Sequence, residues 1–104
     1  ADLFPLHILC DNDEGTVVGI IDWAESRIGD PALDFTGLLS DIGEKFTSEV
    51  LDSYAENSDQ GLMSRARFYA RLLPNDQVSF GQTHGITDFV RTGLDDIESN
   101  ARIK

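Results

Sequence analysis

Residues 7–22 read HILCDNDEGTVVGIID, in which two short apolar runs stand on either side of a cluster of Asp, Asn, Glu and Gly. The second run, residues 16–21, is rich in β-branched side chains, which favour strands. Two such runs around a turn-forming cluster predict an antiparallel β-hairpin. We expect His7 to start the first strand and Asp22 to end the second. Antiparallel pairing would then bring these two side chains together at the open end of the hairpin.

The residues just before the hairpin add a second carboxylate. Asp2 lies five residues before His7. We therefore expect its side chain to reach the same open end from residues 1–6, the lead-in loop that precedes the hairpin. Two carboxylates and an imidazole in one place are the groups that a divalent-metal and general-base site requires. The sequence therefore predicts such a site at the mouth of the hairpin, built from Asp2, His7 and Asp22.

The rest of the chain has the periodicity and the capping residues of α-helices. The first predicted helix has an N-cap at Asp30, followed by Pro31, and a stop at Gly43. A second helix is predicted to have its N-cap at Thr47, with Glu49 in its first turn. A third is predicted over 61–73, where Pro74 ends it, and an apolar helical stripe over 86–97 is weakened by Gly81, Gly85 and Gly93. The expected fold class is therefore α+β, a β-hairpin followed by a mainly α-helical subdomain, in a single domain over residues 1–104.

The chain is small and acidic: its 104 residues carry 19 acidic and 8 basic side chains, for a net charge of −11. This charge disfavours binding to nucleic acid or to an anionic membrane surface. The one cysteine points to a reducing, cytoplasmic setting, and no apolar run is long enough to span a membrane. Ten of the acidic residues lie in residues 1–44, where Arg27 is the one basic residue, for a local net charge of −9. We interpret this surplus either as a solvated face or as carboxylates gathered to bind a metal or a cation.

Three motifs follow one another in the first third of the chain: ADLFPLHIL at residues 1–9, GIIDW at 19–23 and GDPALDF at 29–35. Together they make the sequence resemble the aminoglycoside phosphotransferase family, whose kinase-like members typically show HGDLHPGN, then GVIDW, then GDP followed by Asp. The helices beyond residue 35 match only as the helical part of the C-terminal lobe. The resemblance implies the C-terminal lobe of a protein-kinase-like fold.

The resemblance also implies roles for five residues. It makes Asp2 the catalytic base that accepts the proton of the substrate hydroxyl, and Asp22 the main Mg²⁺ ligand, which bridges the phosphates of ATP or GTP. His7 stands where most members have an Asn that helps to hold Mg²⁺. Asp30 and Asp34 occupy positions at which we expect support of the catalytic loop.

Two departures from the family pattern bear on the metal and the substrate. The His in place of Asn looks like the macrolide phosphotransferase branch, which modifies a hydroxyl on a macrolide sugar and favours GTP. Neutral imidazole suits transition metals better than Mg²⁺, which leaves three interpretations of His7: weak binding to the metal, binding through water, or no binding. Leu6 replaces the usual Gly, which allows the loop a different conformation.

The chain begins at Ala1, just after the position of the family's motif His, and no Gly-rich loop or nucleotide-binding Lys precedes it. We therefore expect the C-terminal catalytic lobe of a larger phosphotransferase, lacking its N-terminal nucleotide-binding lobe and inactive by itself. The expected substrate is a hydroxylated cationic antibiotic, a macrolide or an aminoglycoside, which an acidic surface attracts. The alternative is a non-catalytic kinase-like module that binds a partner through its acidic or interlobe face. The exposed interlobe face is also expected to favour self-association of the fragment.

Each candidate residue has a purely structural interpretation as well. These are a surface charge for Asp2, a packed strand residue for His7, a turn cap for Asp22, a helix cap for Asp30 and a structural carboxylate for Asp34. Elsewhere, Cys10 is expected to be buried and Trp23 to anchor packing. Arg65, Arg67 and Arg71 are expected to form a solvated helix face, with one of them available to pair with the acidic N-terminal portion.

Overall fold

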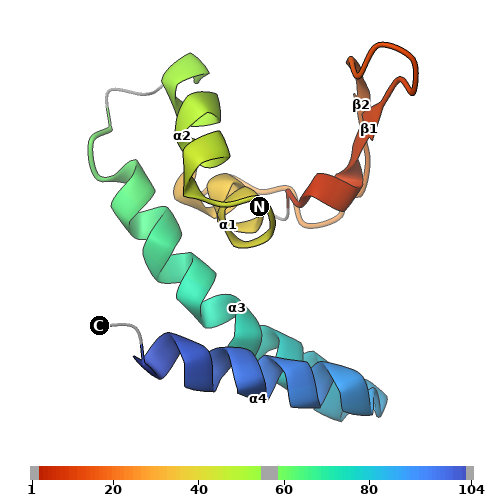
Figure 1. Cartoon of the computed structure of the whole chain (residues 1–104), viewed down its shortest axis with the longest axis vertical. Coiled ribbons are helices and arrows are strands. Elements are labelled where there is room, and N and C mark those ends of the chain that lie inside the picture. The colour runs from red at the N-terminus through yellow and green to blue at the C-terminus, as the bar shows by residue number, and fades with distance from the viewer. Residues whose placement is uncertain (1–2, 55–58, 103–104) are drawn as a thin grey trace. The chain divides into compact units, whose positions relative to one another are not determined.

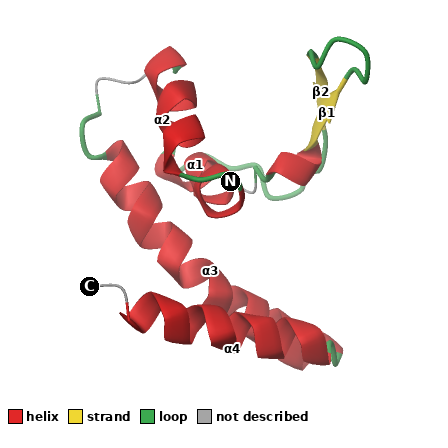
Figure 2. Ribbon diagram, in the orientation of Figure 1, coloured by secondary structure: helices red, strands yellow, loops and turns green. Residues whose placement is uncertain are grey.

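The structure, a computed structural model, describes residues 3–54 and 59–102 (Figure 1). Its elements are, in chain order, the 3₁₀ turn η1 (Pro5–His7), the strands β1 (Ile8–Cys10) and β2 (Val17–Ile20), and the helices α1 (Ala32–Asp41), α2 (Glu44–Ser53), α3 (Leu62–His84) and α4 (Thr87–Arg102). Figure 2 shows that helices dominate after the hairpin. The α+β prediction of a hairpin followed by a helical subdomain is therefore confirmed. Within these ranges no helix combines the length and apolarity that a membrane span needs.

The hairpin forms where the sequence predicts it. β1 and β2 pair antiparallel, with Leu9 opposite Gly19 and an irregularity in register between Leu9 and Cys10. At the turn, the Asp11 carboxylate accepts a hydrogen bond from the Asp13 N–H at 2.7 Å, which is the usual way that Asp stabilises a tight turn. Cys10 is exposed, so the expectation that it is buried was wrong, because two strands alone cannot cover both of their faces.

His7 does not start the first strand, as predicted, but ends the 3₁₀ turn in front of it. Its N–H donates to the Phe4 carbonyl at 2.9 Å, and Pro5 at the start of the turn has the fixed φ that such a turn needs. The His7 carbonyl nevertheless accepts the Ile21 N–H at 2.9 Å. The backbone pairing of the hairpin therefore extends one residue beyond β1 and includes His7.

α1 begins and ends close to the predicted residues. The Asp30 carboxylate accepts the Ala32 N–H at 3.0 Å, which satisfies one of the free donors at the helix N-terminus. At the other end, the Leu38 carbonyl accepts the N–H groups of both Ile42 and Gly43. Gly43 has φ +108°, a conformation that glycine adopts without steric cost. The predicted stop at Gly43 is confirmed.

The predicted N-cap at Thr47 was wrong. α2 begins at Glu44, directly after Gly43, so Glu49 lies beyond the first turn. Thr47 is fully buried, and its hydroxyl donates to the Gly43 carbonyl at 2.8 Å. Thr favours an N-cap because its hydroxyl binds free backbone groups. Here α2 begins directly after Gly43, so Thr47 lies inside the helix. Its hydroxyl therefore binds the Gly43 carbonyl, four residues earlier, instead of capping free N–H groups at a helix start.

The described chain forms two compact units, residues 1–67 and 68–104. In the first unit, the apolar core comprises Ala32, Phe35 and Leu38 of α1 together with Leu62 and Ala66 of α3. The Phe35 ring also meets the Tyr54 ring edge-on, with centroids 5.4 Å apart. α1 is therefore the central element of this unit, and the hairpin reaches it through η1.

Two arginines of α3 bind acidic residues of the first unit. The Arg65 guanidinium contacts Asp30 at 2.8 Å and Asp59 at 2.6 Å, and Arg67 pairs with Glu44. Hydrogen bonding to these arginines lowers the pKa of Asp59 and the pKa of Glu44. The face formed by Arg65, Arg67 and Arg71 is therefore less exposed to solvent than expected. Both Arg65 and Arg67 pair with acidic residues of the N-terminal portion, whereas one such pair was expected.

In the second unit, Pro74 does not end α3, as predicted, because the helix continues to His84. Pro74 is buried, and its carbonyl lies next to Gly93 of α4, so packing against α4 offsets the hydrogen bond that proline removes. Gly81 and Gly93 also lie inside helices, at points where a Cβ would meet the other helix within 3.0 Å. These glycines permit close packing and do not interrupt the helices. Gly85, with φ +68°, makes the turn between them.

Replacing Gly93 by Ala tests this close packing. The added Cβ would lie 2.7 Å from Val78 Cγ2 and 3.1 Å from the Pro74 carbonyl oxygen. We expect Gly93→Ala to lower the free energy of unfolding by about 1–3 kcal/mol, despite the better helix propensity of Ala. The measurement is urea unfolding followed by circular dichroism. Gly29→Ala is the control, since a Cβ there meets no atom within 4 Å, and an equally stable Gly93→Ala protein would contradict the packing argument.

The arginine pairs predict a loss of stability in acid. Because Arg65 lowers the pKa of folded Asp59 below its ordinary value of 3.8, the stabilisation is present above pH 3.8 and is lost as pH falls through the lower, folded pKa. Asp59→Asn removes the charge and retains an oxygen that can accept the Gly61 N–H, as Asp59 does at 3.0 Å. We expect the Asn variant to lose less stability than the wild type below about pH 4. Urea unfolding at a series of pH values measures this, and parallel pH profiles would refute it.

Candidate functional site

The structure brings His7 and Asp22 together at the open end of the hairpin. The His7 Nε2 atom lies 3.3 Å from Asp22 Oδ2. His7 is buried, with 8% of its surface exposed, whereas half of the Asp22 side chain faces solvent. The expected juxtaposition is therefore present, with one ring nitrogen of the imidazole occupied by the carboxylate and the rest of that carboxylate accessible.

Backbone conformation as well as pairing positions the Asp22 carboxylate. Asp22 follows β2 by two residues and has φ +65°. This left-handed conformation is uncommon for residues other than glycine, although Asp adopts it more readily than most. Such conformations are concentrated at functional sites, where surrounding contacts hold them in place. The turn at Asp22 takes the chain out of the hairpin and leaves the side chain at its mouth.

The other predicted site residues have different positions. Asp2 lies outside the described residues, so its predicted role as the base stays a prediction. Asp30 caps α1 and binds Arg65, which are contacts of the structural kind expected for it. Asp34 lies in the first turn of α1 and lines a cavity that Asp22 also lines.

Of these donors, the Asp22 carboxylate suits a magnesium ion and the His7 imidazole suits it poorly. Among the residues that the structure describes, no group of three or more His, Cys, Asp or Glu side chains gathers as a metal site. Mg²⁺ is usually held by one or two carboxylates together with waters and substrate phosphates. The accessible oxygen of Asp22 meets that requirement. The imidazole of His7 is a nitrogen donor, and it already contacts Asp22.

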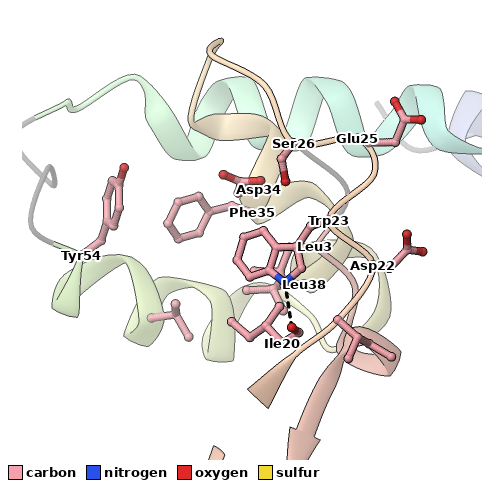
Figure 3. A pocket seen from close by; sticks show the side chains of 12 residues that line it. Leu3, Ile20, Asp22, Trp23, Glu25, Ser26, Asp34, Phe35, Leu38 and Tyr54 are labelled. Carbon is pink, nitrogen blue, oxygen red and sulfur yellow. Dashed lines mark hydrogen bonds between the residues drawn. The ribbon is translucent and has the colours of Figure 1, made fainter. Parts of the chain in front are cut away.

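A cavity of about 300 Å³ opens beside Asp22 (Figure 3). Its lining comes from the lead-in segment, the end of β2, the following loop, α1 and α2, and comprises Leu3, Ile20, Ile21, Asp22, Trp23, Glu25, Ser26, Asp34, Phe35, Leu38, Val50 and Tyr54. The Trp23 indole N–H donates to the Ile20 carbonyl at 2.8 Å, and 64% of Trp23 is exposed. Trp23 therefore does not anchor packing, as expected, but forms part of the cavity wall.

Three residues that line the cavity, Phe35, Tyr54 and Glu25, were not predicted as site residues from the sequence. Phe35 was expected in a helix with other apolar residues, and nothing local distinguishes a core residue from a cavity residue. Tyr54 lies 19 positions later in the chain, at the end of α2. The sequence signal that could have found part of this cavity is the loop after Asp22, because binding residues often lie on loops that a rigid scaffold positions.

The chain is similar to a family of phosphotransferases and to a curated bacterial protein. A family model described as "APH: Phosphotransferase enzyme family" matches residues 1–69. The "Uncharacterized protein YcbJ" of Bacillus subtilis (strain 168) is 45% identical over 53 residues, a match that covers 51% of this chain and 17% of that relative. The chain thus spans less than a fifth of the length of the curated relative it matches. The family match ends within α3, close to the boundary between the two compact units at residues 67 and 68.

Gly37 of α1 positions the segment that leads into the site. A Cβ at Gly37 would collide with the Leu3 carbonyl oxygen and lie 2.8 Å from Phe4 Cδ1. Because the Leu3 atom is backbone, it cannot move without displacing the lead-in to His7. We expect Gly37→Ala to lower the free energy of unfolding by about 1–3 kcal/mol and to shift the NMR signals of the His7 ring.

Gly19→Ala is the matched control in the first unit. Its Cβ would make an ordinary contact of 3.7 Å with Leu9 Cδ1, so we expect a change in stability below about 0.5 kcal/mol. Unfolding and NMR spectra of both variants are measured together. A Gly37→Ala protein with wild-type stability and an unshifted His7 signal would show that Gly37 does not set the position of the lead-in.

Proposed function

This chain belongs to the phosphotransferase enzyme family, and we propose that it supplies the C-terminal catalytic lobe of a kinase-like enzyme. The enzyme transfers the γ-phosphate of ATP or GTP to a hydroxyl group of a small molecule. The observation that carries this proposal is the contact between His7 and Asp22 at 3.3 Å, at the mouth of a hairpin whose lead-in contains Asp2. Phosphoryl transfer depends mainly on positioning and on neutralising charge, and a carboxylate fixed in this way serves both needs.

Each residue has a defined part in the proposed reaction. Asp2 accepts the proton of the acceptor hydroxyl as the hydroxyl oxygen bonds to the γ-phosphorus, while the bond from that phosphorus to the β–γ bridging oxygen breaks and the nucleoside diphosphate leaves. The Asp22 carboxylate would hold Mg²⁺, which would neutralise charge on the nucleotide phosphates. His7 orients the Asp22 carboxylate from its buried position. Because imidazole is a poor ligand for Mg²⁺, this orienting role suits His7 better than direct binding to the metal.

The proposed acceptor is a hydroxylated cationic antibiotic. The first 44 residues carry a local net charge of −9, and such a surface raises the local concentration of cationic ligands. Macrolides and aminoglycosides both carry amines that are protonated at neutral pH. The position of His7 in the motif favours the macrolide branch. We place the enzyme in the cytoplasm, in keeping with its nucleotide donor and its one cysteine.

The function is tested with Asp2→Ala and Asp22→Asn in the full-length protein. Removing a general base typically lowers the rate of the chemical step by about 10²–10⁴-fold, and we expect losses of at least that size for each variant. The measurement is transfer of labelled γ-phosphate to a panel of macrolides and aminoglycosides. Glu14→Gln, an exposed carboxylate of the hairpin turn, is the control and should retain wild-type transfer.

The same assay separates the enzyme from a binding module. Wild-type rates in the Asp2→Ala variant would contradict the assignment of the base. If the full-length wild type transfers no phosphate to any acceptor but retains a protein partner, the chain belongs instead to a non-catalytic kinase-like module. The 104-residue chain assayed alone should show no turnover, because transfer requires groups held in place on both sides of the nucleotide.

A further inference from the structure

One side of α4 carries a row of apolar residues that stay partly open to solvent. Val90, Leu94, Ile97 and Ala101 follow one another at intervals of four, three and four residues, which places them along a single side of the helix. Leu94 is 52% exposed and Ala101 is exposed, whereas Val90 and Ile97 are half-buried. We call these four residues the α4 stripe. Their spacing is the heptad pattern with which one helix packs along another.

The stripe borders the side of α4 that packs on α3 but is not the same side. α4 lies alongside α3 (Figure 1), with buried Gly93 next to Val78 of α3. Successive residues of a helix lie about 100° apart around its axis, so Leu94 is turned away from the contact at Gly93. The family match ends at residue 69, and the proposed reaction uses no residue of α4. Neither the packing on α3 nor the reaction therefore accounts for the stripe.

The charges beside the stripe complement one another when two α4 helices run antiparallel. Arg91 and Glu98 are seven residues apart and occupy equivalent positions next to the stripe. A two-fold axis between Leu94 and Ile97 would set these two residues against each other across the pair. The same axis places Arg91 of each copy beside Glu98 of the other. A parallel pair would instead bring Arg91 against the Gly93 side, whose residues are uncharged.

Arg91 and Glu98 are available for such contacts. Arg91 pairs with Asp88 at 3.1 Å, and Glu98 pairs with Arg102. Both pairs lie within α4, and all four side chains are mostly exposed. Exposed ion pairs of this kind contribute little to stability, so they can be exchanged for pairs between two copies.

The second compact unit is also the part of the chain in which two copies repel each other least. Residues 68–104 contain five acidic and four basic side chains, for a net charge of −1. The other −10 of the net charge of −11 lies in residues 1–67. Contact between two copies through the first unit would bring many like charges together, which opposes association. Contact through α4 does not require this.

We propose that two copies of this chain associate through the α4 stripe, with their α4 helices antiparallel about a two-fold axis. α4 has 16 residues and is therefore about 24 Å long. With α3 beside it, the face is roughly 20 Å wide, so two copies bury on the order of 1,000 Å² in total.

That area is at the lower end for a specific interface, which predicts a dimer with a dissociation constant of about 1–100 μM. The surface is not the interlobe face, through which self-association was expected from the sequence. The inference goes beyond the proposed function and does not depend on it.

Replacing Leu94 tests the stripe in the 104-residue chain. Leu94→Asp puts two charges at the centre of the interface and removes two buried leucines, so we expect dimerisation to weaken by about 100-fold or more. Leu72→Asp is the matched control, because Leu72 is a 42% exposed leucine of α3 outside the stripe, and it should dimerise as the wild type does. Sedimentation velocity from about 1 μM to about 1 mM measures all three proteins. A wild-type chain that stays monomeric over this range would overturn the proposal.

Charge reversal tests which residues meet. Arg91→Glu leaves two acidic residues beside the stripe and Glu98→Arg leaves two basic ones, so each variant repels its own copies. We expect each to dimerise about tenfold more weakly than the wild type. An equimolar mixture of the two variants restores both pairs, and we expect mixed dimers to form about as tightly as wild-type dimers. Parallel helices would not restore these pairs.

A control separates these contacts from a general attraction between opposite net charges. Asp95→Arg makes the same charge change as Glu98→Arg at an exposed position of α4 outside the stripe. Mixed with Arg91→Glu, it should not restore dimers to wild-type affinity. The mixtures are compared at about 0.15 M salt, where long-range attraction is screened.

The remaining outcomes decide between surfaces and between hypotheses. A dimer that Val18→Asp in the hairpin abolishes and Leu94→Asp does not would overturn the proposal in favour of the hairpin. If circular dichroism shows that Leu94→Asp does not fold, the charge variants decide alone, and equal dimerisation by the separate and mixed variants overturns the proposal. Recovery in the mixture supports the α4 interface even if the full-length protein transfers no phosphate, so the two hypotheses fail separately.

Discussion

The hydrogen bond from the Ile21 N–H to the His7 carbonyl, 2.9 Å long, closes the open end of the hairpin. The candidate site depends on it, because it sets the register in which His7 faces the residues that follow β2. A shift of one residue would turn alternate side chains to the other face of the pair. With this register, the left-handed conformation of Asp22 leaves its carboxylate 3.3 Å from the buried imidazole. A short backbone pairing thus determines where the acid and the imidazole meet.

α1 connects this hairpin to the rest of the first unit. Gly37 lets the Leu3–Phe4 segment lie directly on the helix, and Asp30 fixes the helix N-terminus while it binds Arg65. The loop between Asp22 and α1 is therefore held at both ends, by the strand pair and by a buried helix start. The cavity forms between these two anchors, which explains why its lining combines residues of the loop with residues of α1.

Local patterns predicted the parts of the fold whose stabilising contacts are themselves local. The Asp-rich turn, the cap of α1 by Asp30 and the stop at Gly43 each depend on backbone groups within a few residues. The errors arose where distant contacts dominate. Pro74 stays inside α3 because α4 packs on it, and the glycines that seemed to weaken the helices are needed for that packing. Sequence spacing contains no information about a partner helix that follows a turn.

The sequence by itself determined the hairpin, the family and the convergence of His7 with Asp22, because strand pairing over a short turn and an ordered set of motifs are properties of neighbouring residues. Only the tertiary structure decided that Arg65 binds Asp30, 35 positions earlier, and that Phe35 and Tyr54 form one wall of a cavity. Such contacts depend on how helices pack around a shared core. Many sequences with the same local patterns would pack differently, so the cavity and its chemistry follow from three-dimensional arrangement alone.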